Sequence, residues 1–435
     1  MQVPYGQIIR KKNNRMKYLN LQQFWEQLRK NRFFTFLSLF GISIPVMVIM
    51  IMVLKVEMSI KPSGPEKNND EMLFIQQVKI NGKDGTEAWG GVPLNIIENH
   101  FRPLAAPNSL AFSSTGSATF FKNNRARDLS LRYTNADFWK VFDFRFLHGH
   151  AFNEKDVEEQ HNVAVVSGSL ARKLFGKKDA LGTTMDVNGE VYRITGVVED
   201  VSSLSRNTYA QIWLPYTRRN NSPVNADYSH TGAYGVTFRS TETWTGEQIQ
   251  QQVRQVNERL NNLNGDQELI FAGPAPAAEI YFRGYRDPEA YGGLWMSYLG
   301  MAGKALLILF LPALNLVSIN MTRIQERSQE IAIRKAFGAT RKNLALQVMT
   351  ENILLTFLGG VMGLIMAYAV ATGFKEQVFT AWFINNPSEV SLQLNYGVFF
   401  ILIGVSLIFS VLSGLIPAMR ISRLQPAYVM KGGVL

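Results

Sequence analysis

TRIQERSQEIAIRKAFGATRKN, residues 322–343, is a charged segment between two apolar ones. It holds six basic and two acidic residues, whereas ALLILFLPALNLVSI (305–319) before it and ILLTFLGGVMGLIMAYAVATGF (353–374) after it hold none. About 20 apolar residues of α-helix cross the hydrocarbon core of a bilayer. The pattern therefore predicts two membrane spans joined by a short charged segment at one membrane surface.

Apolar windows of this kind occur four times in the chain, at residues 33–54, 294–319, 353–374 and 398–418. The one charged residue in them, Lys304, stands near an end, where a long side chain can reach the interface. Four such windows disfavour the alternative, which is buried helices of a large soluble domain. The sequence predicts a membrane protein with an α-helical transmembrane domain of four spans (33–54, 291–320, 346–374 and 396–418). A large α+β extracytoplasmic domain, 55–290, is expected between spans 1 and 2.

Positive charge is concentrated in three short segments. Residues 1–32 hold eight basic and one acidic residue, residues 322–343 six and two, and residues 419–435 three and none, whereas 56–290 hold 25 and 28. Lys and Arg favour the cytoplasmic side of spans. We therefore expect both termini and the segment 321–345 to be cytoplasmic, and 55–290 and the short loop 375–395 to lie outside. Because the basic residues border the spans, the net charge of +11 does not indicate a nucleic-acid partner.

An amphipathic helix is predicted just before the first span, within the cytoplasmic segment 1–32. Four apolar residues there have helical spacing: Leu21, Phe24, Trp25 and Leu28. Such a helix lies in the inner interface of the bilayer. A simple extension of the first span is the alternative.

The charged segment itself favours a short helix, a sharp turn and a second helix. Ile333 and Phe337 form an apolar pair at i, i+4 spacing. Gly338 suits a left-handed cap that ends the first helix, and Thr340 suits the N-cap of the next. A solvated loop would explain neither feature. The segment therefore presents three apolar side chains that could insert into a groove of a partner protein: Ile331, Ile333 and Phe337.

Small residues on the third span predict close helix packing. They are Gly359, Gly360 and Gly363. Small faces let helix backbones approach closely in lipid. The sequence leaves open whether this face packs within one chain or across a dimer.

Residues 162–201 form the best-defined unit of the external domain. They predict a strand at 163–166, a helix from Leu170 that ends near Gly176, and a hairpin of 184–187 with 190–198 closed by Asn188-Gly189. Four residues of the hairpin then share one face: Met185, Val187, Tyr192 and Ile194. Residues 242–263 predict a helix with an apolar stripe of Ile249, Val253, Val256 and Leu260. Residues 61–70 (KPSGPEKNND) are typical of a linker.

No motif for catalysis or nucleotide binding is found in the sequence. The P-loop pattern is absent, because GKKDALGTT (176–184) lacks a Lys directly before its Thr pair. The chain has no cysteine, which excludes disulfides and Cys-based zinc sites. His148 and His150 could share a metal on a strand, but a solvated role is expected. The chain is therefore predicted to be non-catalytic and to bind no cofactor.

Three regions of the chain resemble the MacB/FtsX-type ABC transporter permeases. The first is FWEQLRKNRFFTFLSLFGISIPV (24–46), and the second is VAVVSGSLARKLFGKKDALGTTMDVNGEVYRITGVVEDV (163–201), which is similar to the periplasmic core domain of that family. The third and most specific is ERSQEIAIRKAFGATRKNLALQVMTENILLTFLGGVMGLIMAY (326–368), with GLIPAMRISRLQPAYVMKGG (414–433) at the end. The order of one span, a large external domain and three spans is also that of the family.

The resemblance implies that the charged segment is a coupling helix region seated on a separate ABC ATPase subunit. Its candidate residues are Gln325, Glu326, Arg327, Glu330, Ile331, Ile333, Arg334, Lys335, Phe337, Gly338 and Ala339. ATP and Mg would be bound by that ATPase. A second permease, identical or paralogous, would complete the dimer, and a periplasmic adaptor and an outer-membrane channel are further partners. The location implied is the bacterial inner membrane, with direct contact to the lipid bilayer.

The function implied is mechanotransmission. ATP hydrolysis in the partner would move the external domain and drive export or extraction of cargo from the periplasm or outer leaflet. The alternatives are an FtsX-like signalling scaffold that activates a cell-wall hydrolase without transport, and a lipoprotein-releasing permease. A membrane-anchored sensor would leave the four spans and the charged segment unexplained.

Overall fold

The computed structural model describes residues 32–60, 64–106, 109–122, 125–176, 180–202, 205–219, 231–263, 267–283, 293–326, 333, 337, 340–374 and 396–423. The chain divides into two compact units. One, the helical unit, comprises Met1–Leu54, Leu299–Lys375 and Leu392–Leu435. The other, the α+β unit, comprises Lys55–Tyr298 and Glu376–Ser391.

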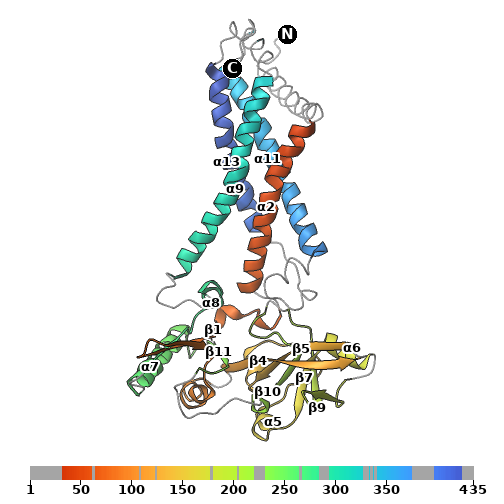
Figure 1. Cartoon of the computed structure of the whole chain (residues 1–435), viewed down its shortest axis with the longest axis vertical. Helices are drawn as coiled ribbons and strands as arrows, with labels where there is room; N and C mark the ends of the chain where they lie inside the picture. Colours follow the sequence, from red (N-terminus) through yellow and green to blue (C-terminus); the bar gives the residue numbers. More distant parts are fainter. Residues whose placement is uncertain are drawn as a thin grey trace, which may run out of the picture. The chain divides into compact units, whose positions relative to one another are not determined.

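Four long helices make up the described part of the helical unit (Figure 1): α2 (Arg32–Ile60), α9 (Gly293–Glu326), α11 (Arg341–Gly373) and α13 (Tyr396–Arg423). Three stretches are long and apolar enough to cross a membrane, namely Thr35–Glu57, Gly293–Phe310 and Met349–Gly373. In α13 the apolar stretch, Gly397–Leu412, is shorter. The described residues therefore give three candidate spans and a shorter fourth one at the predicted places, so the count of four stays a prediction.

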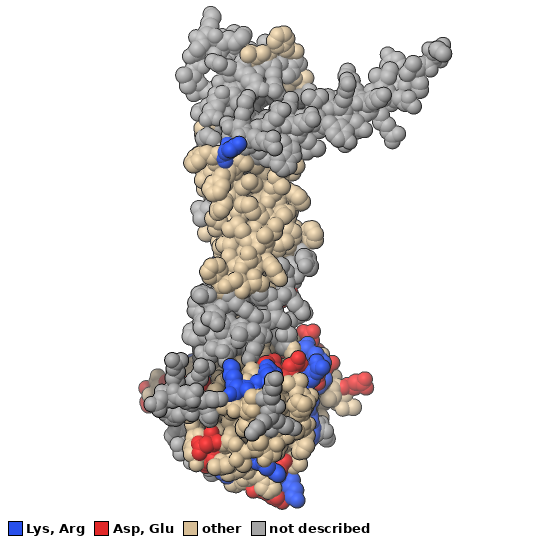
Figure 2. Space-filling view, turned by 90° about the vertical axis from the view of Figure 1, so that its right-hand side faces the viewer, with Lys and Arg blue, Asp and Glu red and all other residues tan. Residues whose placement is uncertain are grey.

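The surface of the helical unit carries almost no charge on the face shown in Figure 2, where nearly all described atoms are neither acidic nor basic. Large apolar side chains are exposed on its helices, among them Leu306, Ile365 and Phe400. Its interior is a cluster of aliphatic and aromatic side chains from all four helices, including Val46 of α2, Leu309 of α9, Ala367 of α11 and Ile403 of α13. A surface as apolar as its core is expected when lipid, and not water, is the solvent.

The α+β unit contains twelve described strands in two sheets. They are β1 (Met72–Ile75), β2 (Val78–Gly82), β3 (Glu87–Gly90), β4 (Leu110–Lys122), β5 (Arg125–Thr134), β6 (Phe146–Gly149), β7 (Val163–Ser167), β8 (Thr184–Val187), β9 (Glu190–Val198), β10 (Ile212–Pro215), β11 (Gly235–Arg239) and β12 (Gln267–Phe271). The larger sheet has the order β1-β11-β4-β5-β10-β7-β9-β6, and β8 pairs with β9. The smaller sheet has the order β12-β2-β3.

Short helices and turns connect the strands and cover the sheets. They are η1 (Gly64–Glu66), η2 (Asn69–Glu71), α3 (Leu94–Ile96), the π-helical turn η3 (Ile97–Phe101), α4 (Phe138–Val141), α5 (Glu154–Glu158), α6 (Gly168–Phe175), η4 (Tyr216–Arg218), α7 (Gly246–Leu263) and α8 (Ala277–Arg283). The unit is therefore α+β, as the sequence predicts.

Both faces of the large sheet are buried, because successive side chains of a strand point to opposite faces. In β1, Met72 and Phe74 join one core while Leu73 and Ile75 join another. The core with Met72 and Phe74 also contains Trp213 and the α4 region. The core with Leu73 and Ile75 lies between β1, β11, β4, α7 and the small sheet. On the same face as Leu73 and Ile75, a third core under α6 and β8 covers the other half of the large sheet. Burial on both faces explains the continuous apolar run of β1.

The predicted strand–helix–hairpin module is confirmed. The strand is β7 and the helix is α6, which ends at Gly176, and the hairpin is β8–β9 with the predicted bounds. At the turn, Asn188 has φ of 53° and Gly189 has φ of 85°, as a type I′ turn requires. The four hairpin residues predicted to share a face are all buried: Met185, Val187, Tyr192 and Ile194.

The predicted amphipathic helix at residues 242–263 is α7, which starts four residues later than the predicted segment, at Gly246. Its four stripe residues are buried: Ile249, Val253, Val256 and Leu260. They pack in the core that β1 and β11 share with α7, and these elements lie beside one another in Figure 1.

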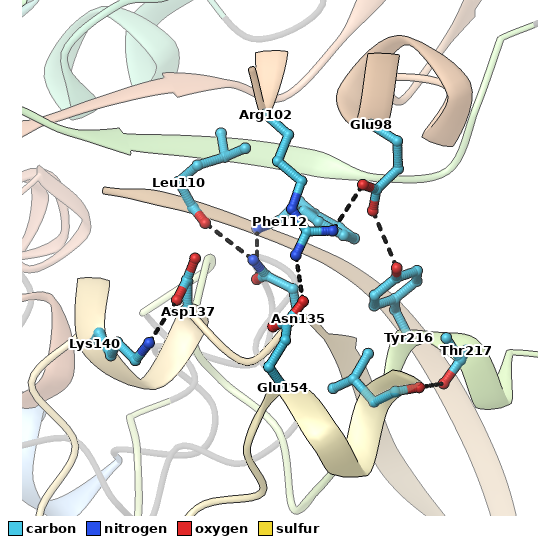
Figure 3. Close-up of polar contacts among 11 residues, drawn as sticks. Glu98, Arg102, Leu110, Phe112, Asn135, Asp137, Lys140, Glu154, Tyr216 and Thr217 are labelled. Atoms are coloured by element: carbon cyan, nitrogen blue, oxygen red, sulfur yellow. Dashed lines mark hydrogen bonds and ion pairs between the residues drawn. The ribbon is translucent and has the colours of Figure 1, made fainter. Parts of the chain in front are cut away.

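A network of polar contacts ties η3 to α5 and η4 on the surface of this unit (Figure 3). Arg102, directly after η3, forms ion pairs with Glu98 and with Glu154 of α5, and Glu98 accepts a hydrogen bond from the Tyr216 hydroxyl at 3.0 Å. Burial and the neighbouring Glu98 raise the pKa of Tyr216. The tyrosine therefore stays protonated and remains a donor in this network.

Candidate coupling site

The described residues of the charged segment are 322–326 at the end of α9, Ile333, Phe337, Thr340, and 341–343 at the start of α11. Gln325 and Glu326 form the last turn of α9, so this helix extends into the charged block. The backbone N–H of Phe337 donates to the carbonyl oxygen of Ile333 at 3.0 Å, which is the i to i−4 bond of a helical turn. A turn of helix therefore stands at the place where the sequence predicts one.

The two apolar side chains of this turn are open to solvent. The exposed fraction is 49% for Ile333 and 89% for Phe337. A phenylalanine this exposed loses the free energy of burial, roughly 1.5–3 kcal/mol, unless another molecule covers it. The remaining candidates lie outside the described residues: Arg327, Glu330, Ile331, Arg334, Lys335, Gly338 and Ala339. The same holds for the predicted interfacial helix with Leu21, Phe24, Trp25 and Leu28.

Thr340 directly precedes α11, which is the position expected for an N-cap. α11 then runs for 33 residues into the apolar stretch. The helix α9 contains a candidate span and ends within the charged segment. The helix α11 begins within the charged segment and contains the next candidate span. The charged segment is thus joined directly to two long continuous helices.

The glycine face of α11 packs against α2 of the same chain. A Cβ atom at Gly359 would lie 2.9 Å from Cβ of Ile42, and one at Gly363 would lie 2.7 Å from the carbonyl oxygen of Ser43 and 2.9 Å from Cβ of Val46. Backbone contact this close leaves no room for a larger residue. Gly360 faces α13 instead, where its Cβ would lie 3.2 Å from Cγ1 of Ile403. In this structure the three glycines thus serve contacts within one chain.

Buried polar side chains also line the helical unit, and sequence reasoning did not single them out. They are Ser38 and Ser43 of α2, Asn352 and Thr356 of α11, and Ser406 and Ser410 of α13. Isolated Ser, Thr and Asn residues in apolar windows give no signal of which way they face. Among the described residues of the four helices, none of the buried side chains is acidic or basic. The described interior therefore lacks the ionisable groups that mark an ion or proton pathway.

The segment that follows α2 is bound to the rest of the α+β unit by a buried carboxylate, Glu66. The sequence reads 61–70 as a linker, but Gly64–Asp70 is ordered and Glu66 is 2% exposed, so the prediction is wrong there. Glu66 accepts hydrogen bonds from the backbone N–H of Asn207 at 3.0 Å, from Nδ2 of Asn207 at 3.1 Å and from the hydroxyl of Thr208 at 2.8 Å. Composition could not reveal this, since the partners lie about 140 residues away.

A buried arginine holds the other side of the same turn. Arg132 of β5 donates from Nε to the Tyr209 carbonyl at 3.1 Å, from NH1 to Ser113 at 2.9 Å and from NH2 to the Arg206 carbonyl at 2.8 Å. Burial lowers the pKa of Arg132 to about 10, and the nearby Glu66 acts in the opposite direction. Burial also raises the pKa of Glu66, against the three donors and Arg132. The turn at residues 205–208 is thus fixed from two sides.

Family comparisons agree with this architecture. The MacB-like periplasmic core domain matches residues 35–256, and the FtsX-like permease C-terminal region matches residues 304–426. The uncharacterized ABC transporter permease YknZ of Bacillus subtilis is 24% identical over 315 residues, which are 70% of each chain. The macrolide export ATP-binding/permease protein MacB 2 of Aeromonas hydrophila is 24% identical over 366 residues, which are 83% of this chain and 50% of that protein.

The chain thus spans about half the length of the Aeromonas protein. Among solved structures, the periplasmic region of MacB from Actinobacillus actinomycetemcomitans is 15% identical over 46% of this chain and 89% of its own, with a TM-score of 0.33. The two family models together cover most of the α+β unit, the apolar stretches of α2, α11 and α13, and the charged segment. The chain belongs to the family of ABC transporter permeases that join a MacB-like periplasmic core domain to an FtsX-like permease region.

Proposed function

We propose that this chain is the permease subunit of a MacB-like ABC transporter and acts as a mechanotransmitter. ATP hydrolysis by a separate nucleotide-binding subunit, which holds ATP and Mg, drives motion of the α+β unit. That motion exports or extracts cargo from the periplasm or the outer leaflet. The helical unit is a set of membrane spans in the inner membrane, and both termini and the charged segment face the cytoplasm.

One observation carries the proposal. A helical turn between α9 and α11 leaves Phe337 89% exposed, and Ile333 lies one turn away at 49%. The hydrocarbon core of the bilayer does not account for these side chains, because six basic residues lie in the same short segment. An aromatic side chain in a charged surround is typical of the centre of a protein interface. We therefore infer that this turn inserts into a groove on the ATPase.

ATP hydrolysis is assigned in this proposal to the nucleotide-binding subunit, because this sequence holds no P-loop. The Aeromonas relative is named as an ATP-binding/permease protein. A second permease would complete the complex. The interior of the described helices buries Ser, Thr and Asn side chains but no acidic or basic one, which supports a role in transmitting motion over one in passing ions through the bilayer.

Co-purification with the ATPase tests the proposal. The combined change Glu330→Lys and Phe337→Ala should reduce the ATPase recovered with the tagged chain from native membranes at least tenfold, because an aromatic anchor of an interface contributes roughly 2 kcal/mol or more. Leu263→Ala is the matched control, since Leu263 is an apolar residue of the α+β unit that is 69% exposed. Recovery at the control level by the double variant contradicts the docking role.

The same purification separates the kinds of function. Mass spectrometry of the intact complex should find a periplasmic adaptor or an outer-membrane channel if the chain serves export. A cell-wall hydrolase in their place would identify a signalling scaffold instead, and the transport part of the proposal would be wrong.

A further inference from the structure

A cavity of about 260 Å³ lies within the α+β unit, where the segment that follows α2 meets the segment that precedes α9. Glu66 stands six residues after the end of α2, and α8 ends ten residues before α9 begins. The wall between them comes from β1, the loop after it and the turn at residues 206–207. The lining residues that matter here are Phe74, Gln76, Arg206, Ala277, Ile280 and Tyr281.

The position of α8 over this cavity follows from close backbone contact. Phe74 and Ala275 exchange two backbone hydrogen bonds, of 2.9 and 3.1 Å. Between the small sheet and this bridge stands Gly273 with φ of 143°, where a Cβ atom would lie 2.4 Å from the carbonyl oxygen of Phe74. Only glycine fits there. These contacts hold residues 273–275 against β1. Ala277 and Ile280 of α8 then pack against the core that contains Phe74 and Trp213.

One wall of the cavity carries a guanidinium that no described carboxylate neutralises. Arg206 is exposed and forms none of the ion pairs of the described residues, and its guanidinium lies 5.7 Å from the centre of the Tyr281 ring. The ring attracts the cation only weakly compared with a carboxylate or phosphate oxygen. Arg206 is therefore available to bind an anion.

The one carboxylate that lines the cavity is occupied. Glu66 already accepts three hydrogen bonds from Asn207 and Thr208, and Arg132 lies behind it. Arg283, a second guanidinium in the lining, is 3.7 Å from Glu279. The charge that faces a ligand is thus positive. The rest of the lining combines apolar and aromatic side chains, such as Ile280 and Tyr281, with uncharged polar ones, Gln76, Gln77 and Asn207.

The turn that bears Arg206 is also held rigidly. Its carbonyl oxygen accepts from Arg132 at 2.8 Å, and the next residue, Asn207, donates to Glu66 and accepts from Nε2 of Gln76 at 2.7 Å. The backbone that bears Arg206 is thus already ordered, so ligand binding does not have to order it.

We propose that this cavity binds a small organic anion with an apolar body, with its carboxylate on Arg206 and its apolar part on Tyr281, Ile280 and Phe74. A cavity of this volume suits a compound of about a dozen non-hydrogen atoms. The site is independent of the coupling role proposed above. The walls of the cavity include Glu66 from the segment that follows α2 and residues of α8 from the segment that precedes α9.

Ligand-observed nuclear magnetic resonance on the full chain in detergent tests the proposal, with 4-phenylbutyrate as probe. The neutral 4-phenylbutyramide and inorganic phosphate separate the contribution of charge from that of the apolar body. The carboxylate should bind at least about tenfold more tightly than either, since a charge-assisted hydrogen bond supplies that difference.

Two variants locate the site. Arg206→Gln should abolish the preference for the carboxylate, and Ala277→Phe should fill the cavity and remove binding while every polar contact stays. Arg145→Gln is the matched control, because Arg145 is an exposed arginine that is not part of the lining. Binding by both variants at the control level overturns the proposal. So does equal binding of the amide, or no binding of 4-phenylbutyrate to the unmodified chain.

Discussion

Gly363→Ala should separate α11 from α2 and destabilise the helical unit. The added Cβ would lie 2.7 Å from the Ser43 carbonyl oxygen and 2.9 Å from Cβ of Val46, whereas ordinary contact begins at 3.4 Å. The nearest atom belongs to backbone, so it cannot move alone. The helices must therefore part by about 0.7 Å, the difference between 3.4 and 2.7 Å.

The magnitude follows from two opposing effects. A gap of about 0.5–1 Å forfeits a quarter to a half of the dispersion energy of each contact, and overpacking of this kind costs about 1–3 kcal/mol. Replacing glycine by alanine inside a helix returns up to about 1 kcal/mol. We therefore expect a loss of about 1–3 kcal/mol in the free energy of unfolding relative to a glycine-to-alanine change that meets no neighbour, and of up to about 2 kcal/mol relative to the unmodified chain when the full gain applies.

Thermal unfolding of the full chain in detergent, followed by circular dichroism, measures this loss. Gly404→Ala on α13 is the matched control, because its Cβ would meet nothing within 4 Å. The control should be as stable as the unmodified chain or slightly more stable. If Gly363→Ala unfolds at the same temperature as Gly404→Ala, the result contradicts close packing of α2 against α11 at Gly363.

Three further predictions concern the α+β unit, each measured by denaturant unfolding of the full chain. Burial raises the pKa of Glu66, so its contribution to stability is complete below the unfolded pKa and is lost as the pH rises through the higher folded pKa. The unmodified chain should therefore lose stability relative to Glu66→Gln as the pH rises above about 4, and parallel curves contradict this. Arg102→Ala should lower the free energy of unfolding by no more than about 1 kcal/mol, and less at high salt, because its ion pairs are partly exposed; a larger, salt-independent loss would indicate packing instead. Gly189→Ala should cost about 1–2 kcal/mol from the φ of 85° alone, since no atom lies within 4 Å of the added Cβ, and an unchanged midpoint argues against the type I′ turn.

Local sequence signals predicted the parts of the fold that depend on neighbouring residues. The β8–β9 hairpin follows from Asn188-Gly189, whose backbone conformation few other pairs adopt. The stripe of α7 follows from helical periodicity, and the helices of the helical unit follow from their length and apolar composition. In each case the deciding contact or conformation lies within a few residues.

Long-range pairing could not be predicted in this way. Nothing in the sequence of β5 indicates that it pairs in parallel with β10, or that β1 pairs with β11 more than 160 residues later. Glu66 lies among Lys, Asn and Asp residues, so its composition indicates a solvated linker although Asn207 and Thr208 bury it. The docking role of the charged segment stays a prediction, supported by the exposed Ile333 and Phe337.

Cysteine labelling tests the central claim, which is that the turn at Phe337 faces the compartment of the ATPase while the α+β unit faces the opposite one. The chain has no cysteine, so Phe337→Cys and Val191→Cys each introduce a single thiol, at positions that are 89% and 54% exposed. A membrane-impermeant maleimide added to intact cells with a permeabilised outer membrane should label Val191→Cys, and should label Phe337→Cys only after the inner membrane is opened. Labelling of Phe337→Cys in intact cells would contradict the account.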